Sequence, residues 1–187
     1  MNPEDKEVIV KEEGNKSFQG RIQYNKIAYI MDVPTEVKVY KSIFGDEIGL
    51  YFLPRVLDNF ARVIISSRMN AECLPLKEWI PEIAKYKKYC DESGLLLRME
   101  IYGGVIPSWL SGEDKKKLTA SIRRKLIAEG EREGEKGFSG RDSIRLFSDF
   151  FRYYSEKSGL ISMNNVSDYF KHKITREQRN ANIPKNF

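Results

Sequence analysis

Cysteine and histidine are scarce in this sequence, and their scarcity removes several classes of site. The 187 residues include two cysteines, Cys73 and Cys90, too few for a disulfide framework or a four-ligand zinc site. The single histidine, His172, would have to serve any Ser–His or Cys–His catalytic arrangement. It stands between two lysines near the end of an expected helix, so we interpret it as a surface residue and predict no metal site.

Long hydrophobic runs are also absent. No stretch approaches the roughly 20 apolar residues that span a bilayer. The first residues, Met-Asn-Pro-Glu-Asp-Lys-Glu, are acidic and polar and do not form a secretory signal. We therefore expect a soluble, cytoplasmic protein with no membrane partner.

The glycine patterns that hold phosphate groups are missing as well. None of the 13 glycines opens a Gly-x-x-x-x-Gly-Lys-Ser/Thr loop or a Gly-x-Gly-x-x-Gly fingerprint. Residues 14–17, Gly-Asn-Lys-Ser, imitate the end of the first pattern but lack the adjacent glycine and lysine. The sequence therefore has no recognisable Walker A element, and it has no recognisable Mg-binding acid pair.

The chain does contain enough apolar material for a core. Hydrophobic residues make up 41% of it, which suits one domain or a core fragment with a smaller appendage. There are 32 Lys and Arg against 27 Asp and Glu, a net charge of +5. Because the acids are interspersed and the basic segment 171–185 has no interleaved aromatics, we interpret that segment as solvated and do not expect a nucleic acid partner.

Periodicity and capping signals predict a mainly α fold with one or two strands near the start. Residues 26–33 are short, apolar and end at Pro34, which indicates a buried strand. Thr35 is typical of an N-cap for a helix over 36–44 that stops at Gly45. The i, i+3, i+4, i+7 spacing of apolar residues predicts a further helix over 54–68.

The second half of the sequence is also predicted to be helical. We expect a helix over 76–89 with Pro81 at a start or kink, and we leave residues 95–102 open between strand and helix. Residues 106–110 indicate a loop that carries an aromatic anchor into the core. Ser111 and Ser139 begin capping signatures that predict helices to about Glu129 and Glu156. A glycine-punctuated loop over 130–137 separates these two helices, and a last helix is expected over 163–173.

Arg141 is the most informative charge in the sequence. It falls at the second position of the helix that begins after Ser139, where a cation opposes the helix dipole. Helix N-termini favour anions, so an arginine beside that end could help to hold a phosphate group. The alternative interpretation is an arginine that pairs with Asp142 or is simply solvated. Arg21, before the expected strand, is a second candidate that says little alone.

Several blocks, taken together and in order, resemble the PrkA family of bacterial serine protein kinases, which carry an AAA+ ATPase module. The resemblance runs from about residue 17 to the last residue. It rests on residues 30–40 (IMDVPTEVKVY), 52–67 (FLPRVLDNFARVIISS), 99–103 (MEIYG), 137–144 (GFSGRDSI) and 182–187 (NIPKNF).

The resemblance implies a register for the whole chain. Residues 1–33 would be the terminal piece of the AAA+ core, with its Walker elements upstream of residue 1. Residues 34–187 would be the helical lid region, with a family-specific insertion at about 70–137. The expected fold is thus a mainly α, AAA+-type lid with an insertion, plus one or two short strands from the end of an α/β ATPase core.

The resemblance also implies roles for two arginines. Arg21 closes the segment Phe18-Gln19-Gly20-Arg21 and matches the region that supplies an arginine finger to a neighbouring subunit, which makes it the catalytic candidate. Arg141 matches the sensor arginine of the lid, which would contact the γ-phosphate of ATP. A trans arginine can accelerate phosphoryl transfer by about 10³–10⁵-fold. ATP and Mg are the cofactors that the intact family protein would use.

We therefore expect the lid and sensor portion of a PrkA-type serine protein kinase. Its partners would be protein substrates, and neighbouring AAA+ subunits or the missing ATPase core. Without Walker A and Walker B, the chain is expected to be inactive alone, which leaves its own status as an enzyme open. The alternative is a non-enzymatic helical interaction module that uses the charged helix after Ser111 and the glycine-rich loop. A basic nucleic-acid binder is the least favoured reading.

Overall fold

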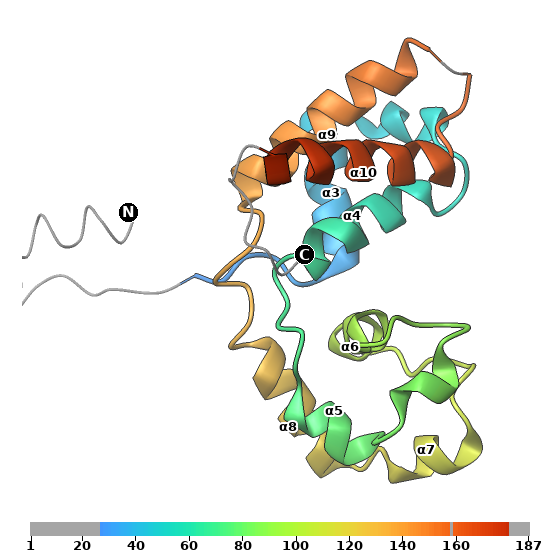
Figure 1. Cartoon of the computed structure of the whole chain (residues 1–187), viewed down its shortest axis with the longest axis vertical. Helices are drawn as coiled ribbons and strands as arrows, with labels where there is room; N and C mark the ends of the chain where they lie inside the picture. The colour runs from blue at the N-terminus through green and yellow to red at the C-terminus, as the bar shows by residue number, and fades with distance from the viewer. Residues whose placement is uncertain (1–26, 158, 180–187) are drawn as a thin grey trace, which may run out of the picture.

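The computed structural model describes residues 27–157 and 159–179, with side chains as far as Lys173. Within these ranges the chain is mainly helical, as the sequence predicts (Figure 1). The elements in order are α3 (Val33–Phe44), the 3₁₀ helix η2 (Asp46–Tyr51), α4 (Val56–Ser66), α5 (Leu74–Trp79), the 3₁₀ helix η3 (Ile83–Tyr86), α6 (Leu95–Tyr102), α7 (Gly112–Lys117), α8 (Ala120–Gly130), α9 (Gly140–Ser155) and α10 (Met163–Arg179).

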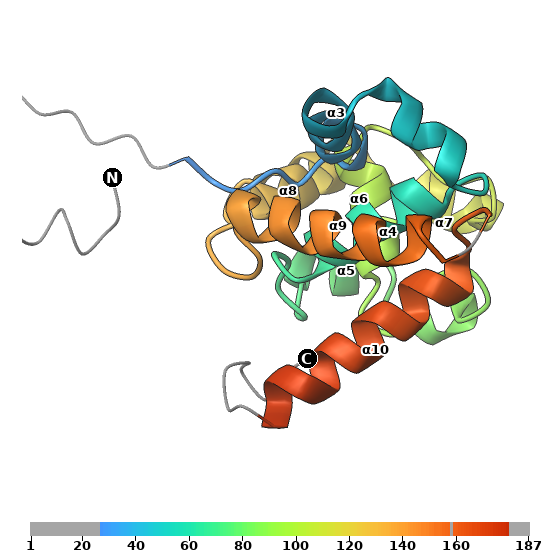
Figure 2. The same ribbon diagram turned by 90° about the horizontal axis from the view of Figure 1, so that it is seen from above.

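The helices form two lobes. The first lobe, the described residues of 27–69 and 138–179, contains α3, α4, α9 and α10. The second lobe, residues 70–137, contains α5 to α8 (Figure 1). Figure 2 shows the C-terminal end of α10 projecting beyond the other helices. Each lobe has a core of its own, because each packs a separate cluster of buried side chains.

Aromatic rings fill the core of the first lobe. The Phe147 ring stacks on Tyr40 with centroids 4.4 Å apart, and Phe60 meets both rings edge-on. Phe60 also contacts Phe150 and Phe170, which brings α4, α9 and α10 together. These residues follow helical spacing in the sequence, and burying one such ring stabilises the fold by about 1.5–3 kcal/mol. The core therefore joins segments more than 100 residues apart.

The core of the second lobe contains Trp79, Leu97 and Leu126 from three different helices. All of its buried members lie between residues 73 and 126, inside the range 70–137 that the resemblance assigns to an insertion. That assignment, and the division into a core piece and a lid, stay predictions. A third, small cluster with Ile65 and Met99 at its centre packs α4 against α6 and so joins the two lobes.

The predicted strand over 26–33 is wrong for the residues that the structure describes. Residues 27–32 form no ladder. Tyr29 N–H donates to Gly134 O at 2.8 Å, and Asp32 O accepts the Glu36 N–H at 3.0 Å as part of the start of α3. Asp32, not Thr35, caps α3, since its carboxylate accepts the Thr35 N–H at 2.9 Å. Pro34 is tolerated in the first turn of a helix, where its missing N–H costs nothing, so α3 begins earlier than predicted.

Two other helices are shorter than predicted. The helix expected over 76–89 ends at Trp79, before Pro81, and resumes only as η3. The helix expected from Ser111 to about Glu129 is interrupted at Leu118, because Thr119 caps a new helix, α8. By contrast, the ambiguous residues 95–102 form α6, and α9 begins with the predicted cap.

Candidate functional site

The N-terminus of α9 has the capping arrangement that the sequence predicts. The Ser139 hydroxyl accepts the Asp142 N–H at 3.2 Å, and the Asp142 carboxylate accepts the Ser139 N–H at 3.2 Å. The backbone ladder starts at the bond from Ser143 N–H to Ser139 O. The amide groups of Gly140 and Arg141 precede that bond and stand at the positive end of the helix dipole.

Arg141 is exposed on the first turn of α9. The ion pair of Asp142 in the structure is with Arg145, at 3.1 Å, and not with Arg141. Arg141 is thus an exposed cation on the first turn of a capped helix. Arg21, the other arginine singled out by the sequence, lies outside the described residues, so the structure does not bring the two together.

A buried ion pair supports this helix end from behind. Arg68 Nη1 lies 2.9 Å from Glu36 Oε2, and both side chains are at most 2% exposed. Arg68 also donates from Nε to Phe138 O at 2.8 Å and from Nη1 to Ile30 O at 2.6 Å. Arg68 therefore links the end of α4 and the start of α3 to the residue before the Ser139 cap.

Two hydroxyl groups complete the surroundings of Glu36. Tyr40 donates to Glu36 Oε1 at 3.1 Å, and the Ser143 hydroxyl donates to the same oxygen. The two hydroxyl oxygens lie 2.8 Å apart. Burial, with the charge of Glu36, raises the pKa of Tyr40 above its ordinary value of 10.0. The raised pKa keeps the Tyr40 hydroxyl protonated at neutral pH, and the hydrogen bonds of the network hold α3 and α9 in place.

A second buried pair lies at the seam between the lobes. Arg98 Nη1 donates to Glu133 Oε1 at 2.8 Å, with both side chains fully buried. Glu133 also accepts the Asn70 N–H at 2.9 Å and the Tyr102 hydroxyl at 3.1 Å. Burial and the charge of Glu133 raise the pKa of Tyr102 above 10.0.

Sequence reasoning missed both pairs. Arg98 had a signal, since it is a charge inside the apolar run over 95–102, where only a paired side chain is tolerated. The sequence signal for the burial of Glu36 was weaker: it shares a helix face with Tyr40, an aromatic residue four positions later. Arg68 and Glu133 stand in polar surroundings in the sequence, which gives no indication that they are buried.

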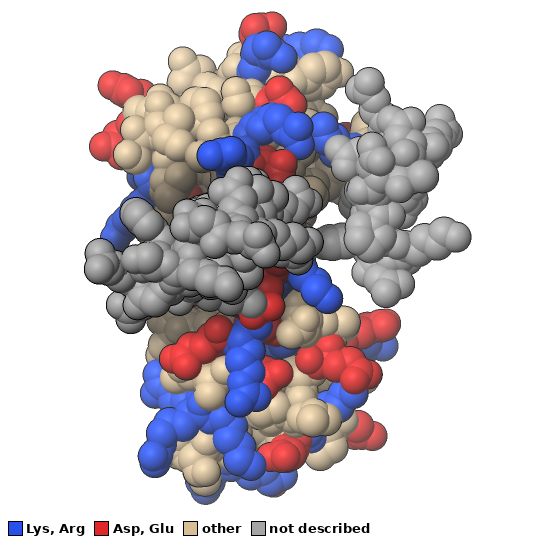
Figure 3. All heavy atoms as spheres, turned by 90° about the vertical axis from the view of Figure 1, so that its left-hand side faces the viewer, with Lys and Arg blue, Asp and Glu red and all other residues tan. Residues whose placement is uncertain are grey.

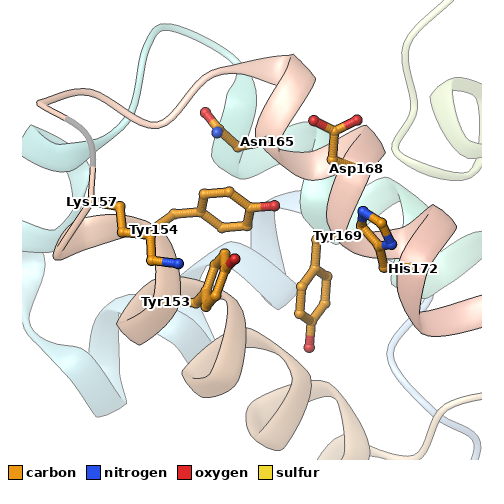
Figure 4. Close-up of a pocket in the computed structure, with 7 residues that line it drawn as sticks. All are labelled: Tyr153, Tyr154, Lys157, Asn165, Asp168, Tyr169 and His172. Carbon is orange, nitrogen blue, oxygen red and sulfur yellow. The ribbon is translucent and has the colours of Figure 1, made fainter. Parts of the chain in front are cut away.

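A groove with a volume of about 620 Å³ runs between the end of α9 and α10. Figure 4 shows Tyr153, Tyr154 and Lys157 on one wall, with Asp168 and His172 on the other. The Lys157 ammonium lies 3.8 Å from the centroid of the Tyr153 ring. His172 is exposed here, in agreement with its interpretation as a surface residue.

The described residues contain no group of three or more His, Cys, Asp or Glu side chains placed to hold a metal ion. Within the same residues, no helix has both the length and the apolar character needed to cross a membrane. The exposed Arg141 guanidinium and the two amide groups beside it are donors of the kind that suit a phosphate oxygen.

Comparison with known families gives a match to a kinase C-terminal domain. Residues 96–185 match the family model of the PrkA serine protein kinase C-terminal domain. This range contains nearly all of α6 and the whole of α7 to α10. This part of the chain is therefore similar to the C-terminal domain of PrkA-family serine protein kinases. The match agrees with the family that the sequence blocks resemble. No curated protein and no solved structure matches the chain.

Proposed function

We propose that this chain is the lid and sensor portion of a PrkA-type serine protein kinase and takes part in ATP binding and sensing. The observation that carries the proposal is the match of residues 96–185 to the PrkA C-terminal domain. ATP would supply the phosphoryl group that the kinase transfers to serine residues of protein substrates. The ATPase core, acting with Mg, would hold the rest of the nucleotide.

Arg141 is the residue proposed to contact the γ-phosphate. Three features of its setting support this role: its exposure, its place at the positive end of a 16-residue helix, and the buried Arg68–Glu36 pair behind that end. A cation at a helix N-terminus is unfavourable unless an anion offsets it, and a bound phosphate would do so. The role of Arg21 as an arginine finger is proposed on the resemblance alone.

Reconstitution tests the role of Arg141. The full 187-residue chain is mixed with the ATPase core of a PrkA-family kinase, and ATP hydrolysis and serine phosphorylation are measured. We expect no turnover by the chain alone. In the mixture, Arg141→Ala should lower kcat by about 10²–10³-fold, the usual cost of removing one preorganised donor aimed at developing charge.

Arg152→Ala is the matched control, because Arg152 lies at the other end of α9 with its side chain 77% exposed. This variant should retain the activity of the unmodified chain. Equal activity of the Arg141→Ala variant and the control would refute the sensor role. ATP hydrolysis by the purified chain alone would refute the requirement for a separate core.

A non-enzymatic interaction module is the second candidate. It is favoured by exposed apolar residues beside the parallel bridge between Phe52 and Ile161, namely Leu50, Leu53, Leu160 and Met163. A chain that binds the ATPase core by size-exclusion chromatography, yet leaves the core's kinase activity unchanged, would support this reading over the first.

A further inference from the structure

One face of the second lobe brings lysines and aromatic rings together from two segments that are distant in sequence. Segment 83–89 runs through η3, and segment 108–117 runs through α7. We call this surface the lysine–aromatic face. Its members are Lys85, Lys88, Tyr89, Trp109, Lys115 and Lys117.

A buried carboxylate fixes the position of the two segments. Asp114, 2% exposed, accepts the Tyr86 hydroxyl at 2.7 Å and pairs with Lys85 at 2.5 Å. Lys117 Nζ lies 3.9 Å from the other oxygen of the same carboxylate. The Asp114 carboxylate therefore contacts two lysines from different elements, and its single negative charge can neutralise only one of them.

The charge of the face is strongly positive. The two segments contain six lysines and two acids, Glu113 and Asp114, the second of which is buried. Lys115 is anchored by a bond from Nζ to Ser108 O at 2.9 Å, which leaves its charge unpaired. The side of the second lobe that Figure 3 shows has a more mixed charge, because acidic side chains lie among the basic ones there.

Two aromatic rings lie among these lysines. Tyr89 and Trp109 stack with centroids 5.4 Å apart and an interplanar angle of 9°, and Tyr89 is 49% exposed. Lys88 Nζ lies 5.6 Å from the Tyr89 centroid, and Trp109 also packs on Tyr86. The ring faces are thus engaged within the protein, so a nucleic acid base has no open ring to stack on.

We propose that the lysine–aromatic face binds an acidic segment of a partner protein. Carboxylates of the partner would pair with the lysines, and its apolar side chains would pack on the edges of Tyr89 and Trp109, the residue types that anchor protein interfaces. The proposal goes beyond ATP sensing and does not depend on it, because it involves neither Arg141 nor a nucleotide.

Fluorescence anisotropy tests the proposal with the full chain. The probe is a fluorescein-labelled 12-residue peptide of six Glu, two Leu and four Ser, used at moderate salt. Replacing Lys88 and Lys117 by Gln should weaken binding about tenfold, since each lysine contributes roughly half of that loss in free energy. Replacing Lys38 and Arg152 by Gln removes the same charge from the first lobe and should leave the affinity unchanged. Circular dichroism confirms that both variants fold.

Tryptophan fluorescence gives a second readout. The chain has two tryptophans, and Trp79 is 1% exposed, so acrylamide quenching reports mainly on Trp109. The bound peptide should protect Trp109 from acrylamide. Equal peptide affinity of the two double variants, or unchanged quenching, would overturn the proposal. So would a dT12 oligonucleotide that binds as tightly as the peptide, because that result indicates general attraction to polyanions.

Discussion

The buried Arg68–Glu36 pair allows a quantitative test of how the first lobe is held together. Arg68→Met removes the counter-charge of Glu36, which remains 2% exposed, and it also removes the donors to Phe138 O and Ile30 O. Leaving one member of a buried pair alone costs about 3–5 kcal/mol. Because domains are stable by only about 5–15 kcal/mol, this loss should be plain in a urea titration.

The double variant Glu36→Gln with Arg68→Met separates the cost of an unpaired buried charge from the cost of the lost hydrogen bonds. No buried charge remains, and two carbonyl groups lose a donor at about 0.5–1.5 kcal/mol each. The double variant should therefore lose about 1–3 kcal/mol, less than Arg68→Met alone. Arg62→Met is the control on the same helix, since its pair with Glu100 is about one-third exposed and should contribute at most about 1 kcal/mol.

The measurement is urea unfolding followed by far-UV circular dichroism, with ΔG taken by linear extrapolation. Two results would refute the reasoning. One is a loss of less than about 1 kcal/mol for Arg68→Met. The other is a double variant whose loss equals the summed losses of Arg68→Met and of Glu36→Gln measured separately, which would mean that the two side chains do not interact.

Two further predictions concern the second lobe and its seam. Gly137 has φ +85°, and a Cβ added there would lie 2.1 Å from Ser67 O. Gly137→Ala should therefore lower the melting temperature. Gly112→Ala is the control and should leave it unchanged, because a Cβ at Gly112 would meet nothing within 4 Å. Burial alone would raise the pKa of Asp114, but the hydrogen bonds from Lys85 and Tyr86 outweigh it and hold the pKa below its ordinary value of 3.8. Asp114→Asn should therefore destabilise the chain at pH 7, and the difference from the unmodified chain should shrink as the pH falls below 3.8 in acid titrations.

Much of the helical framework could be predicted from local signals. The apolar spacing along α4 and the Ser139 capping box identify helices because both signals lie within one or two turns of chain. The expected strand failed because a strand needs a neighbour to pair with, and residues 27–32 have a loop beside them instead. Asp32 and Thr35 compete as caps, and the sequence does not decide between them.

The candidate site was only half predictable. Arg141 stands out in sequence as a cation at a helix start, and the structure places it there, exposed. The buried network behind Arg141 depends on contacts between residues that are distant in sequence. Arg68 and Ser143 both bind Glu36, from which they are separated by 32 and 107 positions, respectively. A single sequence taken by itself gives no information on such pairings, since a polar residue looks the same whether it is solvated or paired.

The seam has a consequence for how this chain can vary. The second lobe leaves the first beside Arg68 and returns at Gly134, whose N–H donates to Arg68 O at 3.1 Å, while Asn70 N–H donates to Glu133. The two chain connections between the lobes thus lie side by side and are hydrogen-bonded to each other. A unit attached in this way can be lengthened, shortened or exchanged between related proteins while the aromatic core of α3, α4, α9 and α10 stays unchanged.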